Sequence, residues 1–269
     1  MKKILGFFFL SVFVFILHGC KGDDPLLRSC GESCVEFGRY YSEEDGSARN
    51  IEWIVLDKEK DGTLLLMSKY ILECLPYNAE RKDVTWETST LRQWLNSDFI
   101  KMAFTHEEQE RLIETNLENN DAEGKLTSAD LEYIKSWNYS EKTIKEMESI
   151  LADEGNNGWH TLGGNDTLDK AWVLAVPDLA TYNFNSRSLR EADPLPILLK
   201  NIGDICMEEN AECEKHGAEG NYSWWLRTPG CVQHAAAAVL YDGYIDDDGV
   251  NADDSSVGVR PVIKIKMKM

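Results

Sequence analysis

Two adjacent tryptophans, Trp224 and Trp225, constrain the fold of this chain more than any other feature. They begin the segment WWLRTPG, which ends at Gly230. Side chains alternate between the two faces of a strand, so neighbouring indole rings point to opposite sides. A sheet that carries this pair therefore needs cover on both faces. Pro229-Gly230 ends the strand, because Pro donates no ladder hydrogen bond and Gly permits a turn.

A second motif, GVRPV at 258–262, stands near the end of the chain and introduces an apolar stretch. We expect one closing strand from Gly258 to Lys266. Between the two motifs, the small residues at 235–240 predict a strand, and Asp242-Gly243 predicts a hairpin turn. The C-terminal part of the chain therefore predicts a mostly antiparallel sheet around which the rest is built.

Alternating residues predict a hairpin near the N-terminus of the fold. Apolar side chains occupy both faces of the segment 51–57, and a second strand is expected at 63–69. The polar turn between them ends in Asp61-Gly62, a turn signal. A strand that is apolar on both faces is typical of the centre of a sheet.

Capping signals predict two helices in the middle of the chain. Thr88-Ser89 can cap the first, whose apolar face includes Trp94 and which we expect to end at Asn96. Thr105 and Glu108 form a capping-box pattern for the second helix. Apolar stripes at this spacing are typical of helices that pack on a core.

WWLRTPG, a variable hairpin and GVRPV resemble, in this order, a bacterial family of extracytoplasmic domains without assigned function. Upstream segments fit the same family in its order, so the resemblance spans residues 35 to 266. These segments are IEWIVL (51–56), LLLMSKYIL (64–72), Trp86 with LRQWLNSDF (91–99), and TLDKAWVLAVPDL (167–179).

The family is similar to the C-type-lectin-like fold shared by formylglycine-generating enzymes and by the variable proteins of diversity-generating retroelements. The resemblance implies an α+β fold over residues 35–269: a C-type-lectin-like, mixed and mostly antiparallel sheet with flanking helices and long loops. In such folds the first and last strands pair. We therefore expect Trp53, Trp224 and Val262 to share one core.

The resemblance also implies structural roles for the motif residues. Arg227 and Arg260 are expected to satisfy buried carbonyls or to pair with an acid such as Asp169, and anion binding is the alternative. The structural motif residues are Trp224, Trp225, Arg227, Gly258, Arg260 and Pro261.

An acidic segment interrupts the family pattern. Residues 107–155 contain 14 Asp and Glu against 5 Lys and Arg. Two helices are expected inside it, beginning at Thr127 and Ser140. Because the family has a shorter connection here, the segment is interpreted as an acidic helical insertion at about 114–160. It is a surface decoration or, as the alternative, an arm that binds a partner.

The first 19 residues have the pattern of a bacterial lipoprotein signal peptide. A charged start precedes an apolar run at 4–17 that is too short for an ordinary membrane-spanning helix. Leu17-His18-Gly19-Cys20 resembles a lipobox, which implies that Cys20 is lipidated and begins the mature chain. Residues 20–34 are then a tether to the bilayer. An ordinary signal peptide with an incidental cysteine is the alternative.

The net charge excludes one class of partner. Removal of residues 1–19 leaves 47 acidic and 26 basic residues, a formal charge of −21. Nucleic acid binding needs a basic footprint, so no nucleic acid partner is expected. An acidic protein does not dock electrostatically on anionic lipid either, so the anchor at Cys20 has to hold it. We therefore expect a lipid-anchored, extracytoplasmic protein of the bacterial cell envelope.

Six more cysteines follow Cys20, and an even number outside the cytoplasm permits disulfides in fifteen connectivities. Local spacing favours Cys30 with Cys34 and Cys206 with Cys213, which leaves Cys74 for Cys231. The alternative is that all six are reduced. The sequence has no spacing typical of a zinc site, and no cofactor is expected.

Carboxylates gather near the C-terminal hairpin. Residues 241–256 contain six Asp and no basic residue, and hard cations such as Ca²⁺ prefer oxygen ligands. Asp246 and Asp248 are the candidate metal ligands. The spacing is not that of an EF-hand loop, however, since Tyr244 stands where the first Asp belongs. A solvated hairpin tip is the alternative.

The stretch between the two motifs also contains the candidate ligand-binding residues. They are of types usually exposed, and Tyr is a large, rigid contact residue with a polar tip. Ordinary hairpin residues are the alternative. The candidates are Gln233, His234, Tyr241, Tyr244, Asp246 and Asn251.

These observations predict a non-catalytic envelope lipoprotein whose lectin-like domain binds a protein or glycan at the C-terminal hairpin. The chain has no G-x-S-x-G, H-E-x-x-H or P-loop motif. By its resemblance it is also a candidate for a retroelement-diversified variable protein. The alternatives are an enzyme of the formylglycine-generating type and a structural envelope protein.

Overall fold

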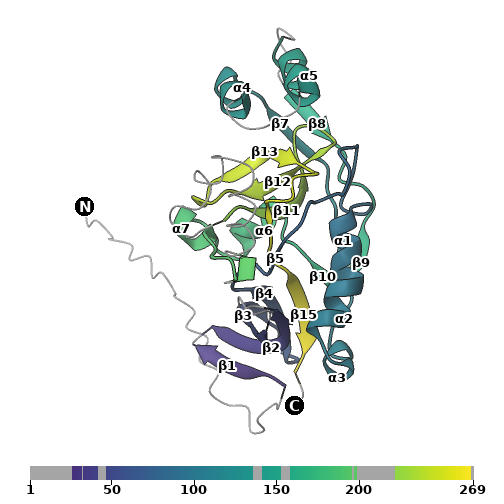
Figure 1. Cartoon of the computed structure of the whole chain (residues 1–269), viewed down its shortest axis with the longest axis vertical. Coiled ribbons are helices and arrows are strands. Elements are labelled where there is room, and N and C mark those ends of the chain that lie inside the picture. The colour runs from purple at the N-terminus through teal and green to yellow at the C-terminus, as the bar shows by residue number, and fades with distance from the viewer. Residues whose placement is uncertain are drawn as a thin grey trace, which may run out of the picture.

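The structure is a computed structural model that describes residues 26–31, 33–41, 47–135, 141–152, 158–195, 197–198 and 222–267. The predicted signal peptide, Cys20, Cys206 and Cys213 lie outside the described residues. The predicted α+β class is confirmed: the strands form mostly antiparallel sheets, with helices beside them (Figure 1). Within the described residues, none of the helices combines the length and the apolar character needed to cross a bilayer.

The larger sheet has six strands in the order β1-β2-β3-β4-β15-β10. The predicted hairpin is confirmed as β3 paired with β4, with Trp53 opposite Ser68. The last strand, β15, pairs with β4 rather than with β3, so the first and last strands share a sheet without direct pairing. The strands are β1 (Arg28–Gly31), β2 (Cys34–Tyr41), β3 (Ala48–Lys58), β4 (Thr63–Ser68), β10 (Ala171–Trp172) and β15 (Val262–Lys266).

The WWLRTPG motif forms the central strand of a smaller sheet, ordered β13-β12-β11-β14-β5. The prediction of one closing strand at 258–266 is wrong, because the segment forms β14 in this sheet and β15 in the larger one. Pro261 has no N–H to donate, so the ladder breaks there and the chain crosses between the sheets. The strands are β5 (Glu73–Cys74), β11 (Trp224–Pro229), β12 (Ala235–Val239), β13 (Ile245–Asn251) and β14 (Gly258–Val259).

Both tryptophans of the motif are fully covered, as their alternation predicts. The Nε1–H of Trp224 donates to the carbonyl of Arg190 at 2.9 Å, and that of Trp225 donates to the carbonyl of Leu75 at 2.8 Å. Trp53, Trp224 and Val262 belong to one apolar cluster, which confirms the predicted core. Both indoles therefore add buried apolar surface to the core that the two sheets share.

The first predicted helix does not end at Asn96. The chain continues through a π-helical turn, and the Asn96 side chain donates to the carbonyl of Ala171 at 2.8 Å and accepts from the N–H of Lys170 at 2.7 Å. These bonds fix the helix to the segment that carries β10. The predicted caps at Ser89 and Thr105–Glu108 are both present. The helices are α1 (Thr90–Trp94), the π-helix η1 (Leu95–Phe99), α2 (Ile100–Ala103), α3 (His106–Gln109), α6 (Val176–Thr181) and α7 (Arg187–Arg190).

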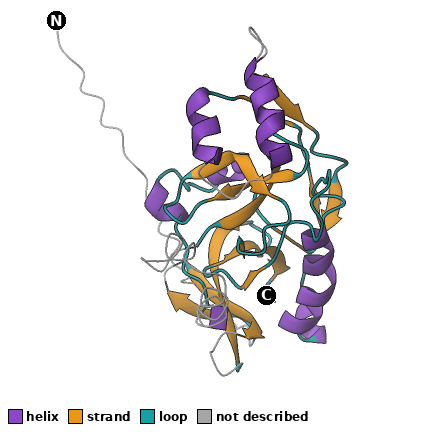
Figure 2. Ribbon diagram, turned by 45° about the horizontal axis from the view of Figure 1, so that its top comes forward, coloured by secondary structure: helices purple, strands orange, loops and turns teal. Residues whose placement is uncertain are grey.

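The part of the acidic insertion from β7 (Ala122–Lys125) to β8 (Gly158–Thr161) forms a projecting arm (Figures 1 and 2). Its base is the ladder of β7 and β8, which runs from Ala122 opposite Thr161 to Lys125 opposite Gly158. A second apolar cluster joins the arm to the connection between β11 and β12, where Cys231 is buried. The elements of this region are β6 (Thr115–Leu117), β7 (Ala122–Lys125), α4 (Ser128–Lys135), α5 (Glu141–Ala152), β8 (Gly158–Thr161) and β9 (Thr167–Asp169).

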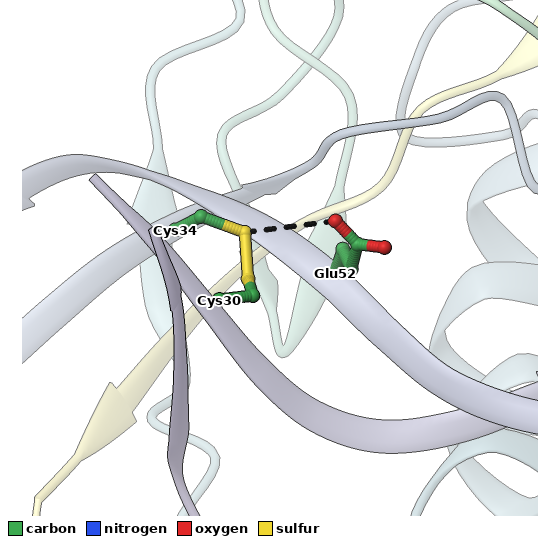
Figure 3. A group of neighbouring side chains, drawn as sticks. All are labelled: Cys30, Cys34 and Glu52. Carbon is green, nitrogen blue, oxygen red and sulfur yellow. Dashed lines mark hydrogen bonds between the residues drawn. A yellow bond between two sulfur atoms is a disulfide. The ribbon is translucent and has the colours of Figure 1, made fainter. Parts of the chain in front are cut away.

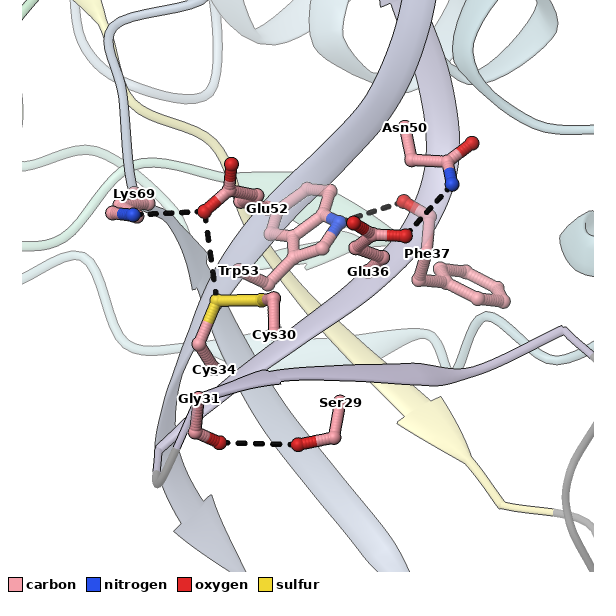
Figure 4. The surroundings of a disulfide bond; sticks show 10 residues. All are labelled: Ser29, Cys30, Gly31, Cys34, Glu36, Phe37, Asn50, Glu52, Trp53 and Lys69. Atoms are coloured by element: carbon pink, nitrogen blue, oxygen red, sulfur yellow. Dashed lines mark hydrogen bonds and ion pairs between the residues drawn. A yellow bond between two sulfur atoms is a disulfide. The ribbon is translucent and has the colours of Figure 1, made fainter.

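Cys30 and Cys34 are joined by a disulfide that links β1 to β2 (Figure 3). Both strands begin inside the predicted tether at 20–34, so the folded part starts before residue 35. The Sγ of Cys34 lies 3.8 Å from a carboxylate oxygen of Glu52. Because a disulfide sulfur carries no proton, this contact is not a hydrogen bond. Glu52 pairs instead with Lys69 at 2.8 Å (Figure 4).

Candidate functional site

Arg260 satisfies buried carbonyls, which is one of the two structural roles that its motif position predicts. Its guanidinium donates to the carbonyls of Ser68 and Lys69 and lies 4.8 Å from the ring centroid of Trp224. Only 2% of the residue is exposed, and burial lowers its pKa to about 9. No carboxylate in the described part of the chain pairs with it. The cation is held by backbone carbonyls and an aromatic face.

Arg227 also serves the fold, but it differs from Arg260 in having an acidic partner. Its Nη1 donates to Asp178 at 2.6 Å and to the carbonyl of Val173 at 3.3 Å. The predicted partner of the motif arginines, Asp169, binds Arg92 instead, at 2.7 Å. The predicted roles therefore hold for both arginines, but the acid named as an example, Asp169, is the partner of neither.

Two of the six predicted ligand-binding residues lie at the base of the arm and are packed there. Gln233 connects two loops, since its amide donates to the carbonyls of Val84 and Leu162 and accepts from the N–H of Leu162. His234 is 2% exposed, and its Nδ1 lies 3.9 Å from a carboxylate oxygen of Glu146. Burial lowers the pKa of His234, while Glu146 acts in the opposite direction.

Two more of the predicted residues are buried in β13. Asp246 is 7% exposed and Asn251 is 5% exposed. The carboxylate of Asp246 accepts the N–H of Gly249 at 3.1 Å, which stabilises the bend in the strand. The expectation that all six residues are of exposed type is therefore wrong for His234, Asp246 and Asn251, which are buried.

The candidate Ca²⁺ site at Asp246 and Asp248 finds no ligand set among the residues that the structure describes. Within those residues, one group of three potential ligand atoms lies close together, and it consists of Cys30, Cys34 and Glu52. The two sulfurs of that group are already joined in the disulfide. Ca²⁺ takes six to eight oxygen ligands. Asp246 is buried rather than solvated, and its carboxylate already accepts the N–H of Gly249.

Tyr241 and Tyr244 are the exposed members of the predicted set. They are 37% and 44% exposed, and they lie on the turn between β12 and β13 beside α7. Leu189 of α7 is 56% exposed. Because β12 separates this turn from Gln233 by five residues, the two ends of the hairpin are about 16 Å apart. The predicted residues therefore do not form one site.

The turn is fixed tightly to α7. Arg187 donates to Asp242 at 2.7 Å, and its guanidinium lies 5.2 Å from the ring centroid of Tyr244. Arg190 donates from Nε to the carbonyl of Gly243 at 2.6 Å. Gly243 has a φ of 73°, and an added Cβ would collide with the backbone of Arg187, so only glycine fits. We call Arg187, Leu189, Tyr241, Asp242 and Tyr244 the tyrosine platform.

The sequence did not reveal the contribution of α7 to the platform. The helix has four residues, and its single leucine stands among polar neighbours. A lone exposed leucine is common on protein surfaces and carries no signal by itself. Only the packing of α7 on the turn between β12 and β13 brings Arg187 to Asp242 and Tyr244.

The expected disulfide between Cys74 and Cys231 is wrong, since both are free thiols. Cys74 packs against the main core, whereas Cys231 belongs to the cluster under the arm. Burial raises the pKa of Cys74 to about 12 and also raises that of Cys231. Neither thiol has the lowered pKa that is typical of a nucleophilic cysteine.

Comparisons with known proteins identify a family but no relative of known function. The family model described as a domain of unknown function, DUF6273, matches residues 61–137 and 130–267. No curated protein matches the chain. No solved structure matches it either.

Proposed function

This chain belongs to the DUF6273 family, whose function is unknown, and we propose that it is a non-enzymatic lipoprotein of the bacterial cell envelope. Its domain binds another protein through the tyrosine platform. The observation that carries the proposal is the exposure of Tyr241 and Tyr244 on a turn that α7 fixes in place, with the exposed Leu189 on α7 itself. Rigid contact residues lose little conformational entropy on binding.

The composition of the platform favours a protein over a glycan as the ligand. Tyrosine and arginine are enriched among residues that dominate protein interfaces. Leu189, at 56% exposure, adds an aliphatic surface that gains most from contact with another apolar surface. Arg187 and Asp242 supply a polar rim beside it.

A cross-linking experiment tests the proposal in cells. A photo-reactive phenylalanine analogue replaces Tyr241 in the full-length chain and, as a matched control, Leu168, which is 57% exposed on β9. We expect a protein adduct that forms from position 241 and not from position 168. The purified partner should then bind wild type and Leu168→Ser, and should lose binding to the double variant Tyr241→Ser and Tyr244→Ser.

Two results would contradict a protein ligand. One is equal cross-linking from both positions, which indicates random collision. The other is binding of immobilised bacterial glycans by the purified chain that the double variant abolishes, which would assign the platform to a glycan. Both readouts use exposed residues, so loss of fold does not explain a loss of binding.

We also propose that the fold is of the C-type-lectin-like kind that the sequence resemblance implies. The support is that the first strands and the last strand share the larger sheet, while a second sheet carries the variable hairpin. If the hairpin is diversified by a retroelement, a reverse transcriptase and a near-copy of the coding segment should lie nearby. In that case the variable positions should include Tyr241 and Tyr244 rather than the buried Asp246 and Asn251.

A further inference from the structure

A cleft of about 320 Å³ lies where the two sheets meet, away from the tyrosine platform. Residues of both sheets line it, together with β6 and α6. Its apolar wall includes Leu65, Trp172 and Leu174. Trp172 and Leu174 are 4% and 1% exposed, so they belong to the core and hold the cleft in shape. Such a volume is at the small end of the range for ligand sites.

Arg227 of the WWLRTPG motif lines this cleft, and one of its polar atoms is left without a partner. Its Nη1 is occupied by Asp178 and by the carbonyl of Val173. Its Nε is buried and has no hydrogen-bond partner. The side chain is only 10% exposed. A guanidinium has two N–H groups on the edge that includes Nε, and this edge matches the two oxygens of a carboxylate.

Other groups around the cleft limit the charge of a ligand. Asp178 and Glu118 contribute two carboxylates to the lining, and Lys264 contributes an ammonium that also pairs with Glu59. These two carboxylates repel any anion, and they repel a dianion such as phosphate about twice as strongly as a monoanion. A monoanion with an apolar body meets one guanidinium edge and the apolar wall.

We propose that this cleft binds a small monocarboxylate with a short apolar body, whose carboxylate contacts Arg227 and whose body packs on Leu65, Trp172 and Leu174. Binding gives the buried Nε of Arg227 the partner that it lacks in the described structure. The site is separate from the tyrosine platform, so it does not depend on the function proposed above.

The test follows the Nε–H resonance of Arg227 by NMR in the full mature chain. The probe is 3-methylbutanoate, and its neutral amide and inorganic phosphate are the comparison compounds. We expect the carboxylate to move the Arg227 resonance saturably in the millimolar range, and the other two to leave it in place. The matched control is the Nε–H of Arg187, which also pairs with an aspartate but lies outside the cleft.

A variant at the mouth of the cleft adds a second readout without disturbing the fold. Glu118 is exposed, so Glu118→Gln should fold normally. Removal of a like charge should tighten binding of 3-methylbutanoate about threefold. The proposal is overturned if the Arg227 resonance does not move, if the amide moves it equally, if Arg187 responds as strongly, or if Glu118→Gln binds no better.

Discussion

Trp224 connects three parts of the molecule through one side chain. Its indole N–H donates to the carbonyl of Arg190, next to the tyrosine platform. Its ring lies under the guanidinium of Arg260, which in turn binds the carbonyls of Ser68 and Lys69. A buried cation without a carboxylate partner needs these carbonyls and this ring. The two family motifs therefore stabilise each other at the level of single residues.

Replacement of Trp224 by alanine should strongly destabilise the domain. The side chain is fully buried, so its loss removes apolar transfer energy and leaves a cavity, at a cost of about 3–5 kcal/mol. Urea unfolding measures the free energy. The control is Leu189→Ala at an exposed position, which should change stability little. Equal stability of Trp224→Ala and wild type would contradict the burial of Trp224 in the core.

Tyr77 makes a prediction about alkaline pH. Its O–H donates to the carbonyl of Arg227 at 3.2 Å, and burial raises its pKa far above the ordinary 10.0. Because the folded pKa is the higher one, its stabilising contribution is complete below pH 10.0 and is lost as pH rises through the folded pKa.

We therefore expect the stability of wild type to fall more steeply than that of Tyr77→Phe between about pH 9 and about pH 11 in urea unfolding. Arg260 has a lowered pKa, which makes the stability of the folded state rise with pH over this range. The comparison of wild type with Tyr77→Phe cancels this contribution, because both proteins contain Arg260. Parallel curves for the two proteins would show that the phenol of Tyr77 is not the group responsible.

At the scale of elements, side-chain hydrogen bonds to backbone carbonyls fix turns and short helices to their neighbours. The turn between β12 and β13 is held by α7, and the π-helical turn η1 is held by Asn96 against the segment of β10. The arm stands on the β7–β8 ladder and touches the rest of the chain through the second apolar cluster. An element that packs on one small cluster can be removed without loss of the main core.

Excision of the arm tests this separation. A two-residue Asn-Gly turn between Lys125 and Gly158, which are cross-strand partners, replaces residues 126–157. The shortened chain should fold, because none of the described residues of that segment belongs to the main cluster. Cys231 loses Leu126 and Met147 from its surroundings. Its alkylation by iodoacetamide should accelerate about tenfold.

Cys74 provides the internal control for this experiment. It packs against the main core rather than under the arm, so its alkylation rate should be the same in both proteins. Mass spectrometry distinguishes the two modified sites. An unfolded shortened chain, or an unchanged rate at Cys231, would show that the arm is an integral part of the fold.

At the scale of the whole molecule, the chain is acidic and its first described strand is β1. If residues 1–19 are removed, the formal charge of −21 repels anionic lipid surfaces, so we expect covalent lipid to provide the attachment. The first described strand begins at Arg28, which leaves few residues between Cys20 and the larger sheet. If Cys20 is lipidated, the larger sheet is held close to the bilayer.

Metabolic labelling with palmitate in a bacterial host tests the anchor. Wild type should incorporate the label and partition with membranes, whereas Cys20→Ser should do neither. The control is Cys74→Ser, which changes a free, largely buried thiol and should keep the label. Equal label in wild type and Cys20→Ser would exclude the lipoprotein assignment.

Local patterns in the sequence determined the elements and much of the core. The alternation at 51–57 predicted β3, the capping box at Thr105 and Glu108 predicted α3, and the paired tryptophans predicted a strand covered on both faces. Each of these depends on residues within a few positions of one another, where period and capping chemistry act directly. The resemblance to a domain family of unknown function came instead from the motif segments taken in order.

The tertiary structure decided which side chains are exposed and which partners they meet. Asp246 and Asn251 are polar residues of a hairpin, yet packing buries them. Asp169 meets Arg92, and the cleft joins Arg227 to residues far away in the chain. Burial and long-range pairing depend on how the two sheets, α6 and α7 pack, and no local period encodes that arrangement.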